Sequence, residues 1–235
     1  TGAVLAQGQP VETAPPNAPD QSPAFEGQTR APQPEAPVEV DQEVIAEGLP
    51  HLWAMEFLPD GRMLVTAKSG VLHIISPDGT VSEPITGLPE VDLVGQGGLL
   101  DVALAPDFES SGRIYVSFAE PREGGNGTSV ARATLVLDGA GSAALEDVEV
   151  IFRQEPTYDG DLHFGSRIVP TEDGNLYVTV GERSDEPIRD EAQDLQSGLG
   201  KVFRITPDGE AAEGNPFASE EALPEIWSLG HRNVQ

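Results

Sequence analysis

The stretch FLPDGRMLVTAKSGVLHII, residues 57–75, runs from an apolar pair through a polar turn into a strand of alternating character. The same pattern returns in LAPDFESSGRIYVSFAE at residues 104–120 and in IVPTEDGNLYVTVGE at residues 168–182. The three stretches begin 47 and 64 residues apart. A four-stranded propeller blade takes roughly 40 to 50 residues, so the longer interval contains an insertion. The pattern therefore predicts an all-β fold made of β-propeller blades, with little helix.

Four turns of one chemistry support this prediction. Proline presets the backbone of the first turn residue, Asp is tolerated at the second, and Gly accepts the left-handed position before the next strand. Each turn is predicted to close a hairpin. A β-sandwich would also contain many short strands, but it does not explain why apolar pair, turn and strand recur together, so the propeller is favoured. The turns are Pro59-Asp60-Gly61, Pro77-Asp78-Gly79, Glu172-Asp173-Gly174 and Pro207-Asp208-Gly209.

The N-terminal part has a different composition from the rest. Residues 8–41 are rich in Pro, Gln, Glu and Ala, with Phe25 as their only aromatic residue, and such a segment buries too little surface to offset its ordering entropy. We predict a disordered, Pro-rich segment at residues 1–43 and a partial propeller at residues 44–235. The opening TGAVLAQGQP resembles the small-residue end of an export signal, which predicts a periplasmic or secreted protein.

The extent of the sequence leads to a further expectation. It begins with Thr1 rather than Met and stops at Gln235, and about three blades do not close a ring. We therefore expect a sequence that is cut at both ends, with the propeller truncated at its C-terminus.

Charge and composition exclude several classes of protein. The chain has 235 residues, and 40 acidic against 13 basic side chains give a net charge of −27, which argues against binding to nucleic acid or to an anionic membrane surface. Cysteine is absent, so disulfides, thiolate zinc sites and cysteine nucleophiles are excluded. No stretch approaches the ~18 apolar residues of a membrane span. We expect a chain that neither binds nucleic acid nor crosses a membrane.

One histidine stands in an unusual setting. His163 is one of four histidines and lies in GDLHFGSR, residues 160–167. Histidine has an unperturbed pKa of ~6.5 and suits proton abstraction from a hydroxyl at neutral pH. Glu182, at the end of the next strand, could hold its ring in one tautomer. The alternative is a structural histidine whose hydrogen bonds are all satisfied.

Scarce cations are the second signal. Arg167, Lys201 and Arg232 lie in the Gly-containing segments HFGSR, LGK and LGHRN, and in so acidic a chain they suggest a requirement for an anion. The alternative for any one arginine is an ion pair between blades.

The segment VGQGGLLDVAL, residues 94–104, is the third signal. Its glycines allow close backbone approach, and Gln96 presents an amide with both donors and acceptors. It is not a dinucleotide fingerprint, because no helical pattern follows it. A substrate contact and a tight loop before a buried strand remain equally open alternatives.

Together these motifs resemble the soluble PQQ-dependent sugar dehydrogenases, the glucose/sorbosone and aldose sugar dehydrogenase family. The resemblance covers about residues 47–235. It implies a six-bladed β-propeller, of which this chain supplies roughly the first half to two thirds. It also implies pyrroloquinoline quinone (PQQ) with calcium, oxidation of the anomeric hydroxyl of an aldose to a lactone, and transfer of electrons to an external acceptor. The motifs are LPHLWAMEFLPDGRMLVT, GQGGLLDVALAPDF, HFGSRIV, AQDLQSGLGKVFRITPDG, NPF and PEIWSLGHRN.

Roles for individual residues follow from the resemblance. His163 matches the base that takes the proton of the sugar hydroxyl, and Gln96 is similar to the family's substrate-site glutamine. Arg232 and Asn233, in GHRN, match the pair that contacts the quinone, with Arg232 placed to stabilise the developing oxyanion. Glu182 stands where the family usually has Asp, so the charge is kept on a longer arm.

Two departures from the family pattern affect these expectations. Leu162 stands where the family often has Asp or another polar residue, which implies the loss of one sugar contact. The family's calcium loop follows the GHRN motif, so the calcium ligands are expected beyond residue 235.

Two rivals come from other functional classes. A calcium-dependent sugar-lactone hydrolase also uses a propeller, but it needs a cluster of Asp, Asn and Glu around one metal, and it leaves Arg232 without a purpose. A non-catalytic binding propeller leaves His163 and Gln96 unexplained. The dehydrogenase is therefore favoured. Whether the subunit forms a homodimer stays open.

Overall fold

The computed structural model describes residues 9–25, 28, 30–34, 36, 39–137, 142–218 and 221–235. The chain divides into two compact units, Thr1–Glu43 and Val44–Gln235. In the first unit, Pro10 and Pro32 form a single antiparallel bridge. The disorder expected for residues 1–43 stays a prediction.

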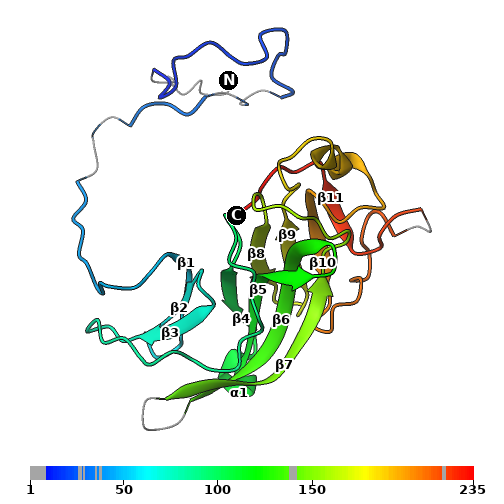
Figure 1. The fold of residues 1–235 in the computed structure, drawn as a ribbon. Coiled ribbons are helices and arrows are strands. Elements are labelled where there is room, and N and C mark those ends of the chain that lie inside the picture. The colour runs from blue at the N-terminus through cyan, green and yellow to red at the C-terminus, as the bar shows by residue number, and fades with distance from the viewer. Residues whose placement is uncertain are drawn as a thin grey trace. The chain divides into compact units, whose positions relative to one another are not determined.

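The second unit consists mainly of three antiparallel sheets, and in each sheet strands that are consecutive in sequence are neighbours (Figure 1). The first sheet contains β1 (Leu52–Phe57), β2 (Met63–Ala67) and β3 (Val71–Ile75). The second contains β4 (Leu99–Leu104), β5 (Arg113–Arg122), β6 (Gly125–Leu137) and β7 (Ala143–Arg153). The third contains β8 (Gly165–Pro170), β9 (Leu176–Val180), β10 (Lys201–Ile205) and β11 (Ile226–Leu229). The short helix α1 (Phe108–Ser111) and the 3-10 helix η1 (Ile188–Gln193) complete the described elements. The all-β prediction is confirmed.

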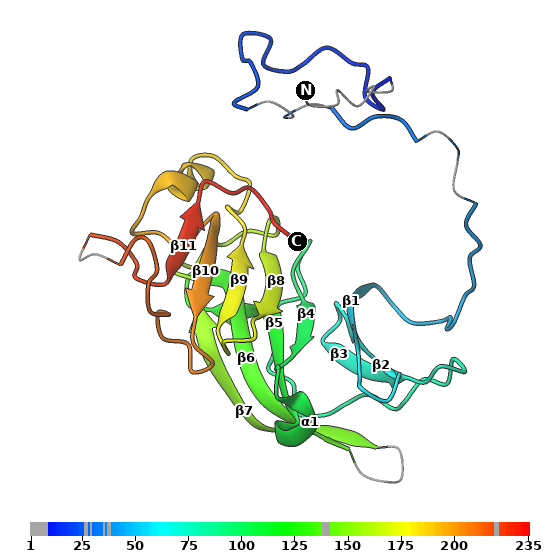
Figure 2. The same cartoon turned by 180° about the vertical axis from the view of Figure 1, so that it is seen from behind.

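The sheets are arranged as blades. The first strands of the three sheets adjoin one another, since β4 contacts both β1 and β8, and Figure 2 shows the three sheets side by side. The described residues thus contain three blades of the predicted six. The long strands β5 to β7, of 10, 13 and 11 residues, account for the insertion inferred between the second and third repeats.

The predicted turns close hairpins. Gly61 and Gly174 have φ angles of +85° and +86°, the left-handed region that only glycine adopts without cost, and they connect the first strand to the second in sheets one and three. The turns at residues 77–79 and 207–209 follow β3 and β10, and each closes on a single bridge, Ile75 with Val81 and Ile205 with Ala211.

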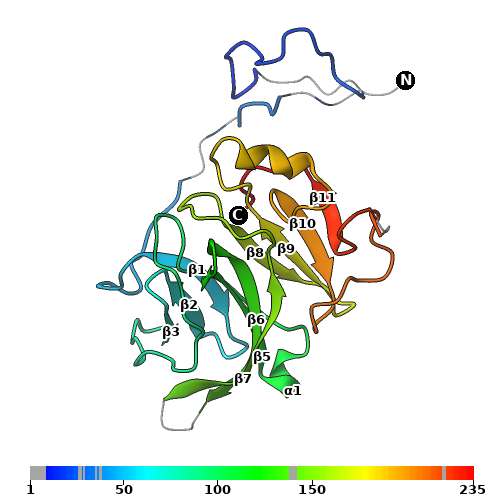
Figure 3. The same ribbon diagram turned by 45° about the vertical axis from the view of Figure 1, so that its right-hand side comes forward.

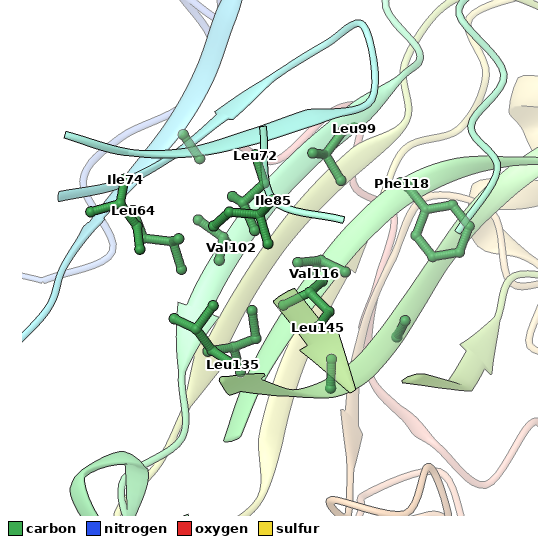
Figure 4. Packing of buried hydrophobic residues seen from close by; sticks show 14 of the residues in the cluster. Leu64, Leu72, Ile74, Ile85, Leu99, Val102, Val116, Phe118, Leu135 and Leu145 are labelled. Carbon is green, nitrogen blue, oxygen red and sulfur yellow. The ribbon is translucent and has the colours of Figure 1, made fainter. Parts of the chain in front are cut away.

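The hydrophobic core lies between the blades. Buried side chains from the first and second sheets form one cluster (Figure 4), and a second cluster joins the second and third sheets. Alternation places one half of each strand's side chains in these layers. Members of the first cluster include Leu64, Leu72, Ile74, Leu99, Val102, Val116, Phe118 and Leu135. Members of the second include Tyr115, Val130, Phe152, Ile168, Leu176, Val178, Phe203 and Ile226.

Each first strand is interrupted by an irregularity in its pairing with the second strand. The register shifts between Leu52 and Met55, between Leu99 and Val102, and between Gly165 and Ile168. A backbone N–H freed by such a bulge donates to a hydroxyl on the second strand of the same blade. The three pairs are Ala54 N to Thr66 Oγ1, Asp101 N to Ser117 Oγ and Arg167 N to Thr179 Oγ1, each at 2.9 Å.

The same three hydroxyls reach onward to the following segment. Thr66 donates to the carbonyl of Leu100 at 2.6 Å, Ser117 to that of Ser166 at 2.6 Å, and Thr179 to that of Val234 at 2.8 Å. All three side chains are buried, and they occupy equivalent positions in the repeated stretches. We call Thr66, Ser117 and Thr179 the hydroxyl bridges. Each links the bulge of its own blade to a backbone carbonyl that lies beyond that blade in the sequence.

Candidate active site

His163 lies two residues before the start of β8, in a tightly packed backbone environment. Its φ angle is +50°, in the sparsely populated left-handed region. A Cβ added to Gly181 would lie 2.0 Å from the His163 carbonyl oxygen, so only glycine allows this approach. On the other side of the loop, Gly165 N donates to Asn233 Oδ1 at 2.8 Å. The segment that carries His163 is therefore fixed by the ends of β8 and β9 and by the C-terminal residues.

The ring of His163 is hydrogen-bonded to a carboxylate. Nδ1 lies 2.6 Å from Glu182 Oε2, and the two side chains are only 14% and 8% exposed. The same carboxylate oxygen accepts Ser184 N at 2.9 Å. With Glu182 ionised, Nδ1 carries the proton and Nε2 keeps its lone pair. Among the described residues, none hydrogen-bonds Nε2, so this nitrogen is available to accept a proton.

Gln96 lies beside His163. Its Oε1 accepts the backbone N–H of His163 at 3.0 Å, and its own N–H donates to Asp161 O at 2.7 Å. The close approach predicted for the glycines is present, because a Cβ on Gly95 would lie 2.3 Å from Asp161 O. Gln96 therefore contacts the segment of the candidate base, and its side-chain NH₂ makes no hydrogen bond with the described residues.

Arg232 and Asn233 complete the group. Arg232 accepts Glu182 N through its carbonyl at 3.0 Å, while its guanidinium is exposed and makes no hydrogen bond or ion pair with the described residues. It lines a cleft of about 380 Å³ together with Glu182, Arg189, Gln193 and His231. Figure 3 shows η1 and the C-terminus at the same end of the third sheet. The structure brings together all five predicted site residues.

A second cleft, of about 420 Å³, lies against β1 and is lined almost entirely by apolar side chains, including Ile45, Leu52, Trp53 and Met63. It offers no titratable side chain for chemistry. The candidate site therefore rests on the group around His163, although this apolar cleft is the larger of the two.

The prediction of an anion requirement is wrong for Arg167. Its Nη1 donates to the buried carboxylate of Asp101 at 2.7 Å, and its guanidinium lies 5.2 Å from the centre of the Trp53 ring. The alternative of an ion pair between blades is the one that the structure bears out. Burial raises the pKa of Asp101 to about 6, although the N–H of Ile168 and the charge of Arg167 oppose this shift.

The prediction is also wrong for Lys201. The side chain points into the protein from the start of β10 and is fully buried, and burial lowers its pKa to about 8. Its Nζ donates to three backbone carbonyl groups, those of Glu191, Ala192 and Leu199, at 2.6 to 3.0 Å. Lys201 thus anchors the end of η1 and the loop after it, and it is not available to an external anion.

Two residues near His163 escaped the sequence reasoning. Arg183 is fully buried behind the loop, and Asn126 of β6 is 3% exposed, with Arg183 Nη2 donating to Asn126 Oδ1 at 2.8 Å. The signal for Arg183 was present in the sequence: it is another of the scarce cations and directly follows Glu182. Asn126 lies 37 positions before His163 and gave no such signal.

The profile of the glucose / sorbosone dehydrogenase family matches residues 49–235. The aldose sugar dehydrogenase YliI of Escherichia coli is 42% identical over 203 residues, which cover 85% of this chain and 53% of that protein. The chain therefore spans about half the length of this relative.

Solved structures give the same result. The apo form of the soluble aldose sugar dehydrogenase of Escherichia coli superposes with a TM-score of 0.74 at 41% identity, over 81% of this chain and 54% of that one. The PQQ-bound form of aldose sugar dehydrogenase from Streptomyces coelicolor gives 0.69 at 33% identity, over 82% of this chain and 54% of that one. This chain belongs to the glucose / sorbosone dehydrogenase family, the soluble PQQ-dependent sugar dehydrogenases.

Proposed function

We propose that the protein oxidises the anomeric hydroxyl of aldose sugars to lactones, with PQQ as cofactor, and passes the electrons to an external acceptor. The observation that carries this proposal is the pair of His163 and Glu182, 2.6 Å apart, with Nε2 of the ring available. Relatives named as sugar dehydrogenases support the substrate class, and the PQQ-bound relative supports the cofactor.

The donor set around His163 fits a quinone that carries carboxylates. The guanidinium of Arg232, which has no partner among the described residues, lies in a cleft that also contains His231, and a guanidinium binds carboxylates well. Arg232 and Asn233 would hold the cofactor. When bound, PQQ supplies a reactive ortho-quinone that accepts the hydride of the sugar.

The chain's own residues supply the proton chemistry. His163 Nε2 accepts the proton of the sugar hydroxyl, and Glu182 keeps the ring in the required tautomer and stabilises the imidazolium that forms. The side-chain NH₂ of Gln96 is available for a sugar oxygen. Because Glu182 also accepts Ser184 N, its carboxylate is held in place before the substrate arrives.

Calcium is the second cofactor that the family resemblance implies. In the part of the chain that the structure describes, no three or more His, Asp and Glu residues are grouped to hold a metal. We therefore assign calcium no residue of this chain. The lactone hydrolase, which requires such a group, has no specific observation in its favour.

The test uses the longest open reading frame that contains this sequence, supplied with PQQ and Ca²⁺. We expect aldoses to drive reduction of an artificial electron acceptor dye. His163→Ala should lower kcat by about 10² to 10⁴, the usual contribution of a general base. The matched control is His73→Ala in β3, because the one hydrogen bond that the His73 ring makes with the described residues is to Ser82 O. This variant should keep wild-type turnover. Absence of dye reduction, or unchanged turnover in His163→Ala, rejects the proposal.

We propose further that the protein works in the periplasm or outside the cell, because TGAVLAQGQP has the small-residue character of an export-signal end. In the described residues, no helix is long and apolar enough to span a membrane. Cell fractionation with an antibody against the propeller tests the location. Recovery in the cytoplasmic fraction alone contradicts it. Whether the protein forms a homodimer is decided by the mass of the purified protein in solution.

A further inference from the structure

Arg183 makes no ion pair with the described residues, although the charges of Asp161, Asp185 and Asp92 act on it from a longer distance. It is fully buried, and burial lowers the pKa of its guanidinium to about 10. In the part of the chain that the structure describes, no carboxylate lies within ion-pair distance of it. A buried charge is costly unless it is hydrogen-bonded. The hydrogen bonds of the Arg183 guanidinium therefore indicate its role.

The guanidinium holds the backbone on one side of His163. Nε donates to Leu162 O at 3.0 Å, and Nη2 donates to Gly160 O at 2.7 Å. The planar fork of an arginine fixes the spacing of the acceptors that it binds. Two carbonyls of residues 160–162 are therefore set relative to one another by a single side chain.

The other side of His163 is held by a ring contact. The centre of the guanidinium lies 4.1 Å from the centre of the Phe164 ring, well within the range of a cation–π interaction. Phe164 is 2% exposed, so its ring is fixed in the core. Arg183 thus contacts residues 160, 162 and 164, while the side chain of His163 between them stays free of it.

Asn126 supports this arrangement from β6. Its Oδ1 accepts Arg183 Nη2 at 2.8 Å, and its Nδ2 donates to Gly160 O at 3.0 Å and to Asp92 Oδ2 at 3.0 Å. Gly160 O is therefore held by both residues. The guanidinium is locked against the second blade as well as against the loop.

The backbone around the site needs such support. His163 and Arg183 have φ angles of +50° and +70°, and non-glycine residues stay in this region only where their surroundings over-determine them. Arg183 also directly follows Glu182. One dipeptide therefore provides both the carboxylate that binds the ring of His163 and the guanidinium that binds the loop carrying it.

We propose that Arg183 is a positioning residue, which holds residues 160–164 so that the His163 ring meets Glu182 and keeps Nε2 available. The proposal rests on the proposed function only for its effect on turnover. Its effect on the geometry of the His163–Glu182 pair is independent of the reaction.

The test compares Arg183→Lys with Arg204→Lys in the longest open reading frame. Arg204 is the matched control, because it also lies over an aromatic ring, Trp227 at 5.5 Å, and donates to a carboxylate, Asp173 at 3.0 Å, but far from His163 in the third sheet. Lysine keeps the charge and loses the fork. We expect kcat to fall at least tenfold in Arg183→Lys with the KM for sugar changed less than threefold, and neither value to change more than twofold in Arg204→Lys.

Two further readouts separate positioning from general damage. Exogenous imidazole should restore part of the turnover of Arg183→Lys and of His163→Ala, and should leave the wild type unaffected. The proton on His163 Nδ1, in its 2.6 Å hydrogen bond, should give a downfield NMR resonance that is absent in His163→Ala. We expect that resonance to be lost in Arg183→Lys and kept in Arg204→Lys.

The outcomes are distinct. If the wild type reduces no dye, the proposed function fails, while the NMR comparison still decides the positioning role. If Arg183→Lys keeps the resonance and stays within twofold of wild-type kcat, the inference is overturned. Should Arg183→Lys not fold, Asn126→Ala removes the outer support only, and it should lower kcat several-fold with an unchanged KM. Wild-type kcat in that variant also overturns the inference.

Discussion

Replacing Thr66 by Val tests the hydroxyl bridges, because valine keeps the branched shape of threonine and removes only the hydroxyl. In the wild type this hydroxyl accepts Ala54 N at 2.9 Å and donates to Leu100 O at 2.6 Å. Both backbone groups belong to buried residues, with Ala54 9% and Leu100 1% exposed. A buried polar group left without a partner costs about 1 to 3 kcal/mol. Two such groups predict a loss of about 2 to 6 kcal/mol in the free energy of unfolding.

That loss is large beside the ~5 to 15 kcal/mol that stabilises a typical domain. With a slope of about 3 kcal/mol per molar that the substitution leaves unchanged, we expect the urea midpoint of the Thr66→Val variant to fall by about 0.7 to 2 M. Thr66→Ser is the matched control, because it keeps the hydroxyl and loses only a methyl group. Its loss should be clearly smaller. The reasoning is refuted if Val at this position is within 0.5 kcal/mol of wild type, or if Ser costs as much as Val.

Three further changes have expected outcomes. Burial raises the pKa of Asp101 from its ordinary value of 3.8 to about 6 in the folded protein, so its ionisation costs stability as pH rises from about 4 to 6. The wild type should therefore lose stability relative to Asp101→Asn across that interval, and a constant difference in pH-dependent urea unfolding contradicts this. Gly181→Ala would place a Cβ 2.0 Å from His163 O and should lower the rate of sugar oxidation at least tenfold. The control is Gly174→Ala, whose Cβ would meet nothing within 4 Å, so it should keep full activity and lose only about 1 kcal/mol of stability from its strained φ. Equal activities of the two variants would show that the close approach at Gly181 is unimportant. Lys201→Met removes the one donor that Leu199 O has among the described residues, while the carbonyls of Glu191 and Ala192 keep the N–H groups of Asp194 and Gly230. The loss in chemical denaturation should be about 1 to 3 kcal/mol, and a loss under about 0.5 kcal/mol would contradict this.

The blades could be read from the sequence because their signals are local. A Pro-Asp-Gly turn dictates its own backbone, and Gly61 and Gly174 have the left-handed φ angles that this chemistry requires. The hydroxyl bridges were not predicted, although Thr66, Ser117 and Thr179 occupy equivalent positions. Their partners, such as Leu100 O and Ser166 O, lie 34 and 49 residues away, and no local pattern indicates which carbonyl a hydroxyl will meet.

The candidate site was predicted in part. His163 and Glu182 followed from the spacing of a base and a carboxylate, while the roles of Gln96, Arg232 and Asn233 came from the family resemblance. Rarity of positive charge was a poor guide, because burial decides what a cation does. Arg167 is paired with Asp101 and Lys201 is satisfied by carbonyls. Of these three, Arg232 is the one whose charged group makes no hydrogen bond or ion pair with the described residues.

The hydroxyl bridges also bear on how such a chain can lengthen during evolution. Each of these hydroxyls lies on the second strand of its own blade, and it donates to a backbone carbonyl, a group that every residue possesses. A duplicated stretch of gene that encodes one blade would thus already encode the hydroxyl that bonds to the next blade. The next blade would need no complementary side chain, because it contributes only a backbone carbonyl. Propellers of different circumference could then arise from one ancestral unit by repetition alone.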